Sequence, residues 1–88
     1  MEKDTKVTLR FMPRIIRRYR DASGLSQQQL ADCLDVSKGF ISALEGGRSV
    51  PNLDRLLQIA KALRVPPGVL VDALAQEAEE STRKIQKS

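Results

Sequence analysis

Apolar residues recur at helical spacing along most of this chain of 88 residues, and the clearest pattern lies between residues 25 and 46. Two short helices are predicted there, because Ser26 and Ser37 can each accept a hydrogen bond from a free backbone N–H of the turn that follows. The residues expected to face inward are Leu30, Ala31 and Leu34 in the first helix, and Phe40, Ile41 and Leu44 in the second. Gly46 is suited to a left-handed cap at the end of the second helix. Since only Asp35 and Val36 separate the two, they must cross steeply, and the pattern predicts a helix-turn-helix.

Three more helices are predicted around this pair. Pro13 suits the first turn of a helix that runs to about Ser23, Asn52 can cap a second, and the proline pair at 66–67 ends that second helix and starts a third. Their expected inward residues are Ile15, Ile16 and Tyr19, then Leu53, Leu56, Leu57, Ala60 and Leu63, and finally Val69, Leu70, Ala73 and Leu74. The expected fold is all-α, a compact five-helix bundle over residues 13–75.

The two ends of the chain are less regular. Val7, Leu9 and Phe11 alternate with polar residues, which is the period of a strand. A lone strand has no partner in a helical chain, so residues 1–12 are expected to form a loose arm, with Phe11 and Met12 against the core, or to pair outside the chain. Residues 76–88 are polar and form either a tail or a helix extension that is expected to fray.

Charge points to a polyanionic partner. The net charge is +4 and the pI is about 9.6, and between Arg10 and Arg64 there are ten Lys and Arg against five Asp and Glu. Cys33 is the only cysteine and histidine is absent, so neither an intrachain disulfide nor a zinc site is expected, and no cofactor is implied. Cys33 itself is expected to be a small buried residue.

With no long apolar run and no leader-like start, a cytosolic protein that binds no membrane is expected. Without histidine or paired carboxylates in a cleft, an enzyme is not expected.

The run from Arg20 to Leu70 resembles the phage repressor and Cro-like helix-turn-helix family, also called XRE, whose fold is of the lambda repressor type. The matching segments are Arg20, GLSQQQLA at 24–31, VSKGFISALEGGR at 36–48 and PNLDRLLQIAKALRV at 51–65. The resemblance implies that the two short helices between residues 26 and 46 bind double-stranded DNA, with the one that follows Ser37 in the major groove. It also implies that the protein binds two half-sites as a homodimer. Asp35 departs from the family, which often has glycine there because the backbone takes a positive φ. Asp tolerates that conformation with some strain.

Particular residues are expected to contact DNA. On the outer face of the helix that follows Ser37, the candidates for base contact are Lys38, Gly39, Ser42 and Ala43. Lys38 can donate to guanine, and the other three are poor readers, so DNA shape is expected to supply the remaining specificity. The candidates for phosphate contact are Gln27, Ser37, Arg48, Arg14, Arg17 and Arg18. The resemblance also places an Arg–Glu pair at Arg20 and Glu45, where an arginine fork would offset a carboxylate at the negative end of a helix.

These residues predict a sequence-specific transcriptional regulator, most simply a repressor. The same domain would serve an antitoxin or the controller of a restriction–modification system, with the polar tail free to bind a toxin or other protein. A protein-binding adaptor that no longer reads DNA is a further alternative, but Lys38, Arg48 and the arginines near the start of the chain argue against it. A two-fold dimer is expected to form through Val71 and Leu74 on the last helix.

Overall fold

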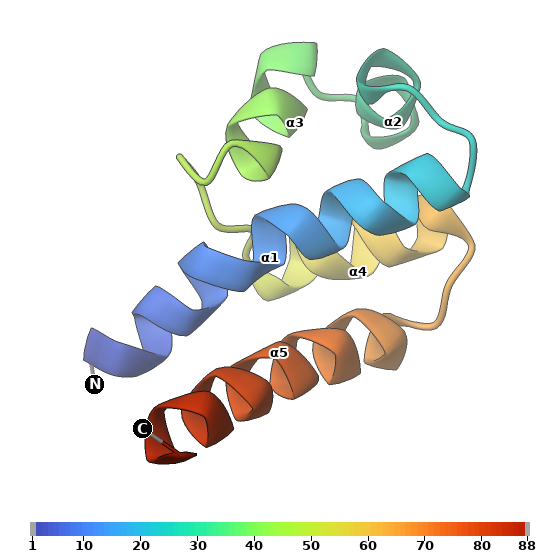
Figure 1. Ribbon diagram of the computed structural model, residues 1–88. Helices are drawn as coiled ribbons and strands as arrows, with labels where there is room; N and C mark the ends of the chain where they lie inside the picture. Colours follow the sequence, from blue (N-terminus) through green and yellow to red (C-terminus); the bar gives the residue numbers. More distant parts are fainter. Residues whose placement is uncertain (1, 88) are drawn as a thin grey trace.

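The computed structural model describes the backbone of residues 2–87 and the side chains of residues 10–81. Five helices account for the regular structure of this part of the chain, which confirms the all-α prediction (Figure 1). They are α1 (Glu2–Ala22), α2 (Gln27–Leu34), α3 (Lys38–Glu45), α4 (Leu53–Leu63) and α5 (Pro67–Lys87). None of these described helices is long and apolar enough to cross a membrane.

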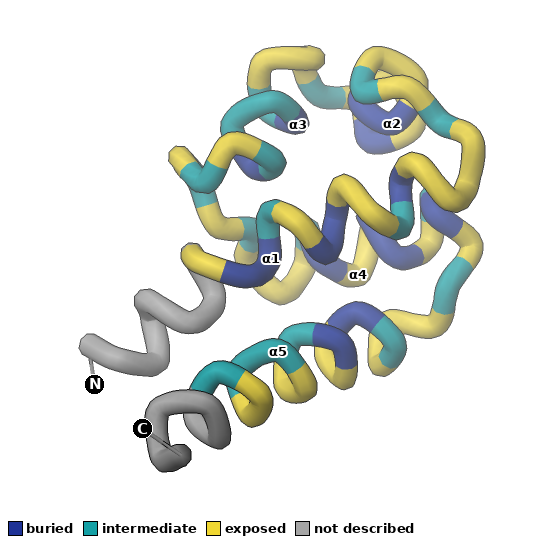
Figure 2. The backbone as a smooth tube through the Cα atoms, viewed as in Figure 1, coloured by how far each residue is buried: buried dark blue, intermediate teal, exposed yellow. Residues whose placement is uncertain are grey.

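The two short helices lie on one side of α1 and α4, and α5 lies on the other (Figure 1). The α2 helix packs against α3 and α4, and α1 packs against α3 and α5. The buried positions of all five helices therefore meet at the centre of the molecule (Figure 2). The side chains with almost no exposed surface are Ile15, Ile16, Leu30, Ile41, Leu44, Ile59 and Leu70. An aliphatic core of this kind holds α2 and α3 rigidly on the outside of the bundle.

The helix ends follow the local signals in the sequence. The Ser26 hydroxyl accepts from the Gln29 N–H, and the Gln29 side chain accepts from the Ser26 N–H, which completes a capping box. Ser37 accepts from the N–H of Phe40, and Asn52 accepts from the N–H of Arg55. Each predicted N-cap is thus confirmed.

The first helix begins earlier than the sequence predicts. It starts at Glu2 rather than Pro13 and continues through the proline, so the expected loose arm or strand over residues 1–12 is wrong. Phe11 and Met12 are buried and extend the apolar face of Ile15 and Ile16 towards the N-terminus. We attribute the continuation to this burial, which offsets the roughly 3 kcal/mol that an interior proline costs. At the other end, residues 76–87 continue α5, so the polar segment is a helix extension rather than a tail.

Two other expectations about side chains are wrong. Cys33 is exposed, whereas the sequence predicted a buried residue. On α4, Leu53 and Leu57 are 69% and 44% exposed, and Ile59 fills the core instead. The α2 helix buries the face that was predicted, and Cys33 lies outside that face. On α4 the neighbouring helices, and not the wheel of one helix, decide which side is covered, so the side chain of Ile59 is buried in place of those of Leu53 and Leu57.

The prediction of a left-handed cap at Gly46 is also wrong. Gly46 has a φ of −91°, and the left-handed residue is Gly47, with a φ of +78°. The left-handed turn therefore comes one residue later than predicted, and Gly47 is the position that needs a residue without a Cβ.

Candidate nucleic-acid interface

The outer surface of α3 is an arc bounded by two anchored edges. Ile41 and Leu44 point into the core and fix the rotation of the helix. At about 100° per residue, the remaining residues follow one another around the helix in the order Phe40, Ala43, Gly39, Ser42, Lys38 and Glu45. Lys38 and Gly39 are exposed, and Ser42 and Ala43 are half-buried. The four residues predicted to contact bases are therefore neighbours on one continuous face.

The edge of the arc at Glu45 is held by Arg20. The Arg20 Nε donates to Glu45 Oε2 at 2.6 Å, and Nη2 donates to Glu45 Oε1 at 3.0 Å, so the predicted pair is present as a two-pronged contact. Nη1 of the same guanidinium donates to the Leu25 carbonyl oxygen at 2.8 Å. One side chain of α1 therefore fixes both the end of α3 and the loop that leads into α2.

Gln27 completes this network. Its Nε2 donates to Glu45 Oε1 at 3.1 Å, so the first residue of α2 is tied to the last residue of α3. The side chains of Arg20 and Glu45 are only 10% and 4% exposed, and within the described residues no buried side-chain nitrogen or oxygen lacks a partner. The relative position of α2 and α3 is thus set by hydrogen bonds as well as by apolar packing.

The electrostatic balance at Glu45 favours the ionised carboxylate. Burial alone would raise the pKa of Glu45, but the hydrogen bonds from Arg20 and Gln27 and the charges of Arg20 and Arg17 outweigh it, and the pKa is lowered from its ordinary value. The hydrogen bond to Glu45 correspondingly raises the pKa of Arg20. Both groups are charged at neutral pH, and the pair is stable there.

The residues predicted to bind phosphate have different surroundings. Arg17 lies one turn before Arg20, close enough for its charge to act on Glu45. Arg14 is exposed on α1, and the guanidinium of Arg18 lies over the ring of Tyr19 at 5.4 Å. The exposed Arg48 runs back along the backbone at Gly46, beside the end of α3. Of the six predicted residues, Ser37 and Gln27 already make hydrogen bonds within the protein.

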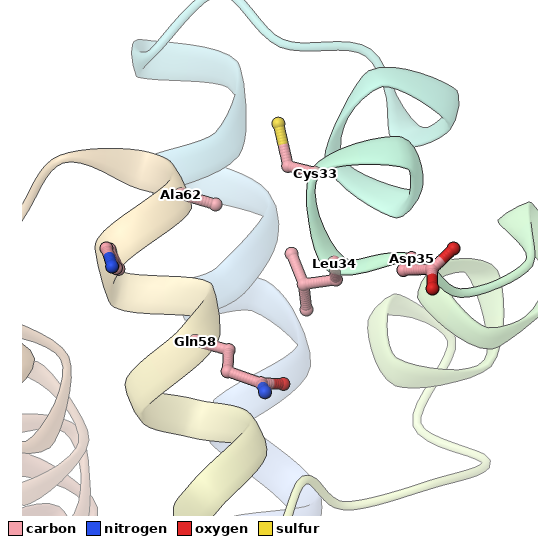
Figure 3. Close-up of a pocket in the computed structure, with 6 residues that line it drawn as sticks. Cys33, Leu34, Asp35, Gln58 and Ala62 are labelled. Atoms are coloured by element: carbon pink, nitrogen blue, oxygen red, sulfur yellow. The ribbon is translucent and has the colours of Figure 1, made fainter.

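The other edge of the arc carries a contact that the sequence did not predict. The guanidinium of Arg55, on α4, lies over the ring of Phe40 at 5.2 Å, and its Nη1 donates to Gln58 Oε1 at 2.9 Å. Gln58 itself lines a hollow of about 370 Å³ between α2 and α4, beside Leu34 (Figure 3). Phe40 was expected to face inward, and it is half-buried at the edge of the core. No rule of spacing joins residues of two different helices, so no signal in the sequence indicated this contact.

The two residues predicted to form a dimer interface differ in exposure. Val71 is 47% exposed, whereas Leu74 is half-buried and packs against the core. The other large exposed apolar side chains of the described region are Val50, Leu53 and Leu57, which lie in the loop before α4 and in the first half of that helix. Val71 therefore offers the freer surface on α5.

Comparison with known proteins agrees with this geometry. Residues 16–70 match the helix-turn-helix family HTH_3. An uncharacterized HTH-type transcriptional regulator of Mycobacterium tuberculosis is 46% identical over 55 residues, which cover 62% of this chain and 39% of that protein. The transcriptional regulator ClgR of the same organism is 35% identical over 60 residues, or 67% of this chain and 54% of ClgR. The crystal structure of the clp gene regulator ClgR from Corynebacterium glutamicum superimposes with a TM-score of 0.70 at 25% identity and 84% coverage of both chains. The chain thus spans about two fifths of the first relative and about half of the second.

Proposed function

This chain belongs to the Cro-like helix-turn-helix family of DNA-binding transcriptional regulators, which are not enzymes, and we propose that it is a repressor that binds an operator of two half-sites as a homodimer. In this proposal α3 lies in the major groove of double-stranded DNA. Lys38 reads a guanine, while Gly39, Ser42 and Ala43 allow close approach and contact base edges and methyl groups.

One observation carries the proposal. The exposed arc of α3 is free of large side chains at its centre, and the network of Arg20, Glu45 and Gln27 holds it in fixed register with the N-terminus of α2. A helix N-terminus attracts phosphate through its free N–H groups and dipole. Phosphate held at α2 would place α3 at a constant depth in the groove, which is what base reading requires.

We propose a dimer because few side chains on α3 can distinguish one base from another. A single lysine is too little to select one site among the many competing sites of a genome, and two copies related by a two-fold axis double the number of base contacts. Val71 and Leu74 on α5 are the proposed contact, with Val71 as its exposed part. Repression then requires only that the occupied operator excludes another protein from the same DNA.

Selection of bound duplexes from a random pool tests this function. The expected result is a pseudo-palindromic sequence whose half-sites are separated by about 34 Å, one turn of DNA, or a multiple of it. Affinity for that sequence should fall steeply with salt, with a slope of about −0.9 on logarithmic axes for each phosphate neutralised. A pool that yields no preferred sequence would contradict sequence-specific binding, and an affinity that salt leaves unchanged would contradict DNA as the partner.

A further inference from the structure

The two edges of the α3 arc face different parts of a DNA groove. A helix in the major groove presents the middle of its exposed arc to the bases, and its two flanks face the two phosphate backbones that border the groove. Phe40 and Glu45 mark these flanks, and the exposed arc between them spans about 220° of the helix, with Ile41 and Leu44 on the remaining, buried side. The flank at Glu45 has Arg17 and the start of α2 beside it. The flank at Phe40 needs a comparable donor.

Arg55 lies at that second flank. Its guanidinium lies over the ring of Phe40, and a hydrogen bond from Nη1 to Gln58 restricts the rotation of the guanidinium plane. Among the hydrogen bonds of the described side chains, this is the only one that the guanidinium makes, so most of its five N–H donors remain available. Arg55 is half-buried, and its charge therefore remains accessible to a ligand.

We propose that Arg55 binds a phosphate of the DNA strand opposite the one that the N-terminus of α2 contacts. The inference rests on the proposed placement of α3 in the major groove. Stacking on Phe40 and the bond to Gln58 arrange the guanidinium before DNA arrives, so little side-chain freedom is lost on binding. The aromatic ring also covers one face of the guanidinium and leaves the donors at its edge for a ligand. Clamped between two phosphate strands, α3 is held at a defined rotation in the groove.

Salt titration of matched variants tests this contact. The test variant is Arg55→Gln. The control variant is Lys61→Gln, which removes one positive charge from an exposed residue further along α4. Affinity for the selected duplex is measured between 50 and 200 mM salt. Arg55→Gln should reduce the slope by about 0.9 per protomer, or about 1.8 for the dimer on two half-sites, so the ratio of wild-type to variant affinity should fall about 12-fold over this range. Lys61→Gln should leave the slope unchanged. Arg55→Lys keeps the charge but not the planar fork, and should keep the wild-type slope with a smaller loss of affinity.

The possible contrary results separate this inference from the proposed function. Equal changes in slope for Arg55→Gln and Lys61→Gln would mean that only total charge matters, and would overturn the specific contact. A loss of affinity at an unchanged slope in Arg55→Gln would make Arg55 a support for Phe40 and would also overturn it. Either result leaves the proposed function intact, whereas wild-type protein that binds no DNA would overturn both. Thermal melts of each variant confirm that the compared proteins are folded.

Discussion

At the scale of single residues, Arg20 does more for this structure than its position on a basic helix suggests. It joins α1 to Glu45 at the end of α3 and to the carbonyl oxygen of Leu25, and Glu45 in turn accepts from Gln27. Because both charged side chains are nearly fully buried, removing one would leave the other without its two-pronged ion pair in a poor solvent for charge. That loss costs on the order of 3 kcal/mol or more.

The pH dependence of unfolding should report this pair. The folded-state pKa of Glu45 is lowered from 4.5, so its contribution to stability is fully present above that value and is lost as pH falls through the lower folded-state pKa. Glu45→Gln lacks this titration. We expect the wild-type protein to be the more stable at neutral pH, and the difference in unfolding free energy to narrow below about pH 4.5. Urea denaturation at a series of pH values measures it.

The control for this experiment is the neighbouring acid Asp21. Its carboxylate lies 3.2 Å from Arg20 but is 63% exposed, so Asp21→Asn should change stability by well under 1 kcal/mol at any pH. Parallel pH profiles for wild type and Glu45→Gln would show that the buried pair does not control the acid unfolding.

Two other residues, Asp35 and Arg64, hold left-handed backbone conformations without being glycine. Their φ values are 57° and 61°, at the C-caps of α2 and α4. A left-handed L-residue costs about 1–2 kcal/mol, partly offset by the greater chain entropy that glycine loses on folding. Arg64→Gly should therefore raise the free energy of unfolding by about 0.5–1 kcal/mol. Arg64→Ala removes the same side chain but keeps the Cβ, so a similar gain in both variants would assign the effect to charge rather than to strain.

At the scale of helices, the sequence predicted what local chemistry determines. Ser26, Ser37 and Asn52 cap α2, α3 and α4 because a side-chain oxygen and a backbone N–H two or three residues away suffice. The left-handed Asp35 and the Arg20–Glu45 pair were expected from the family resemblance, since nothing in their spacing alone joins two residues on different helices.

What escaped prediction depends on contacts between helices. The start of α1 at Glu2 follows from the burial of Phe11 and Met12, not from any signal at Pro13. On α4 the side chain of Ile59 is buried and that of Leu57 is exposed, because the neighbouring helices cover the side of α4 that carries Ile59. The stacking of Arg55 on Phe40 joins α4 to α3, and a helical wheel of either helix alone cannot show it.

The recognition helix itself supports a prediction about specificity. Lys38 is the long donor on the exposed arc of α3, so Lys38→Ala should cost roughly 1–3 kcal/mol on the selected operator and relax the choice of base at one position of each half-site. Arg48→Ala serves as the comparison, because loss of a phosphate contact should weaken binding to all sequences alike. Titrations of the operator and of a scrambled duplex distinguish the two. An equal loss on both duplexes for Lys38→Ala would make Lys38 a phosphate contact.

At the scale of the whole molecule, the two proposed surfaces belong to different parts of the bundle. The α2 and α3 helices lie on one side of α1 and α4, and α5 lies on the other (Figure 1). A contact through α5 would therefore leave the α3 arc uncovered. Apolar side chains are also exposed at Val50, Leu53 and Leu57, which provide the alternative surface for self-association.

The dimer prediction is best tested at Val71, because Leu74 packs against the core and its replacement by a charge would disturb folding as well as association. In a two-fold dimer the same surface of each protomer faces its copy, so Val71→Glu would bring two negative charges close together in the contact. We expect a folded monomer that loses most of its affinity for a two-half-site operator but keeps weak binding to a single half-site. Light scattering gives the mass, and titration with one-site and two-site duplexes gives the affinities. Leu57→Glu, with a side chain of 44% exposure in the wild type, is the matched variant and should remain dimeric. If Leu57→Glu is the monomer instead, and Val71→Glu still dimerises, the interface lies at the start of α4 and the two recognition helices are brought together from that side.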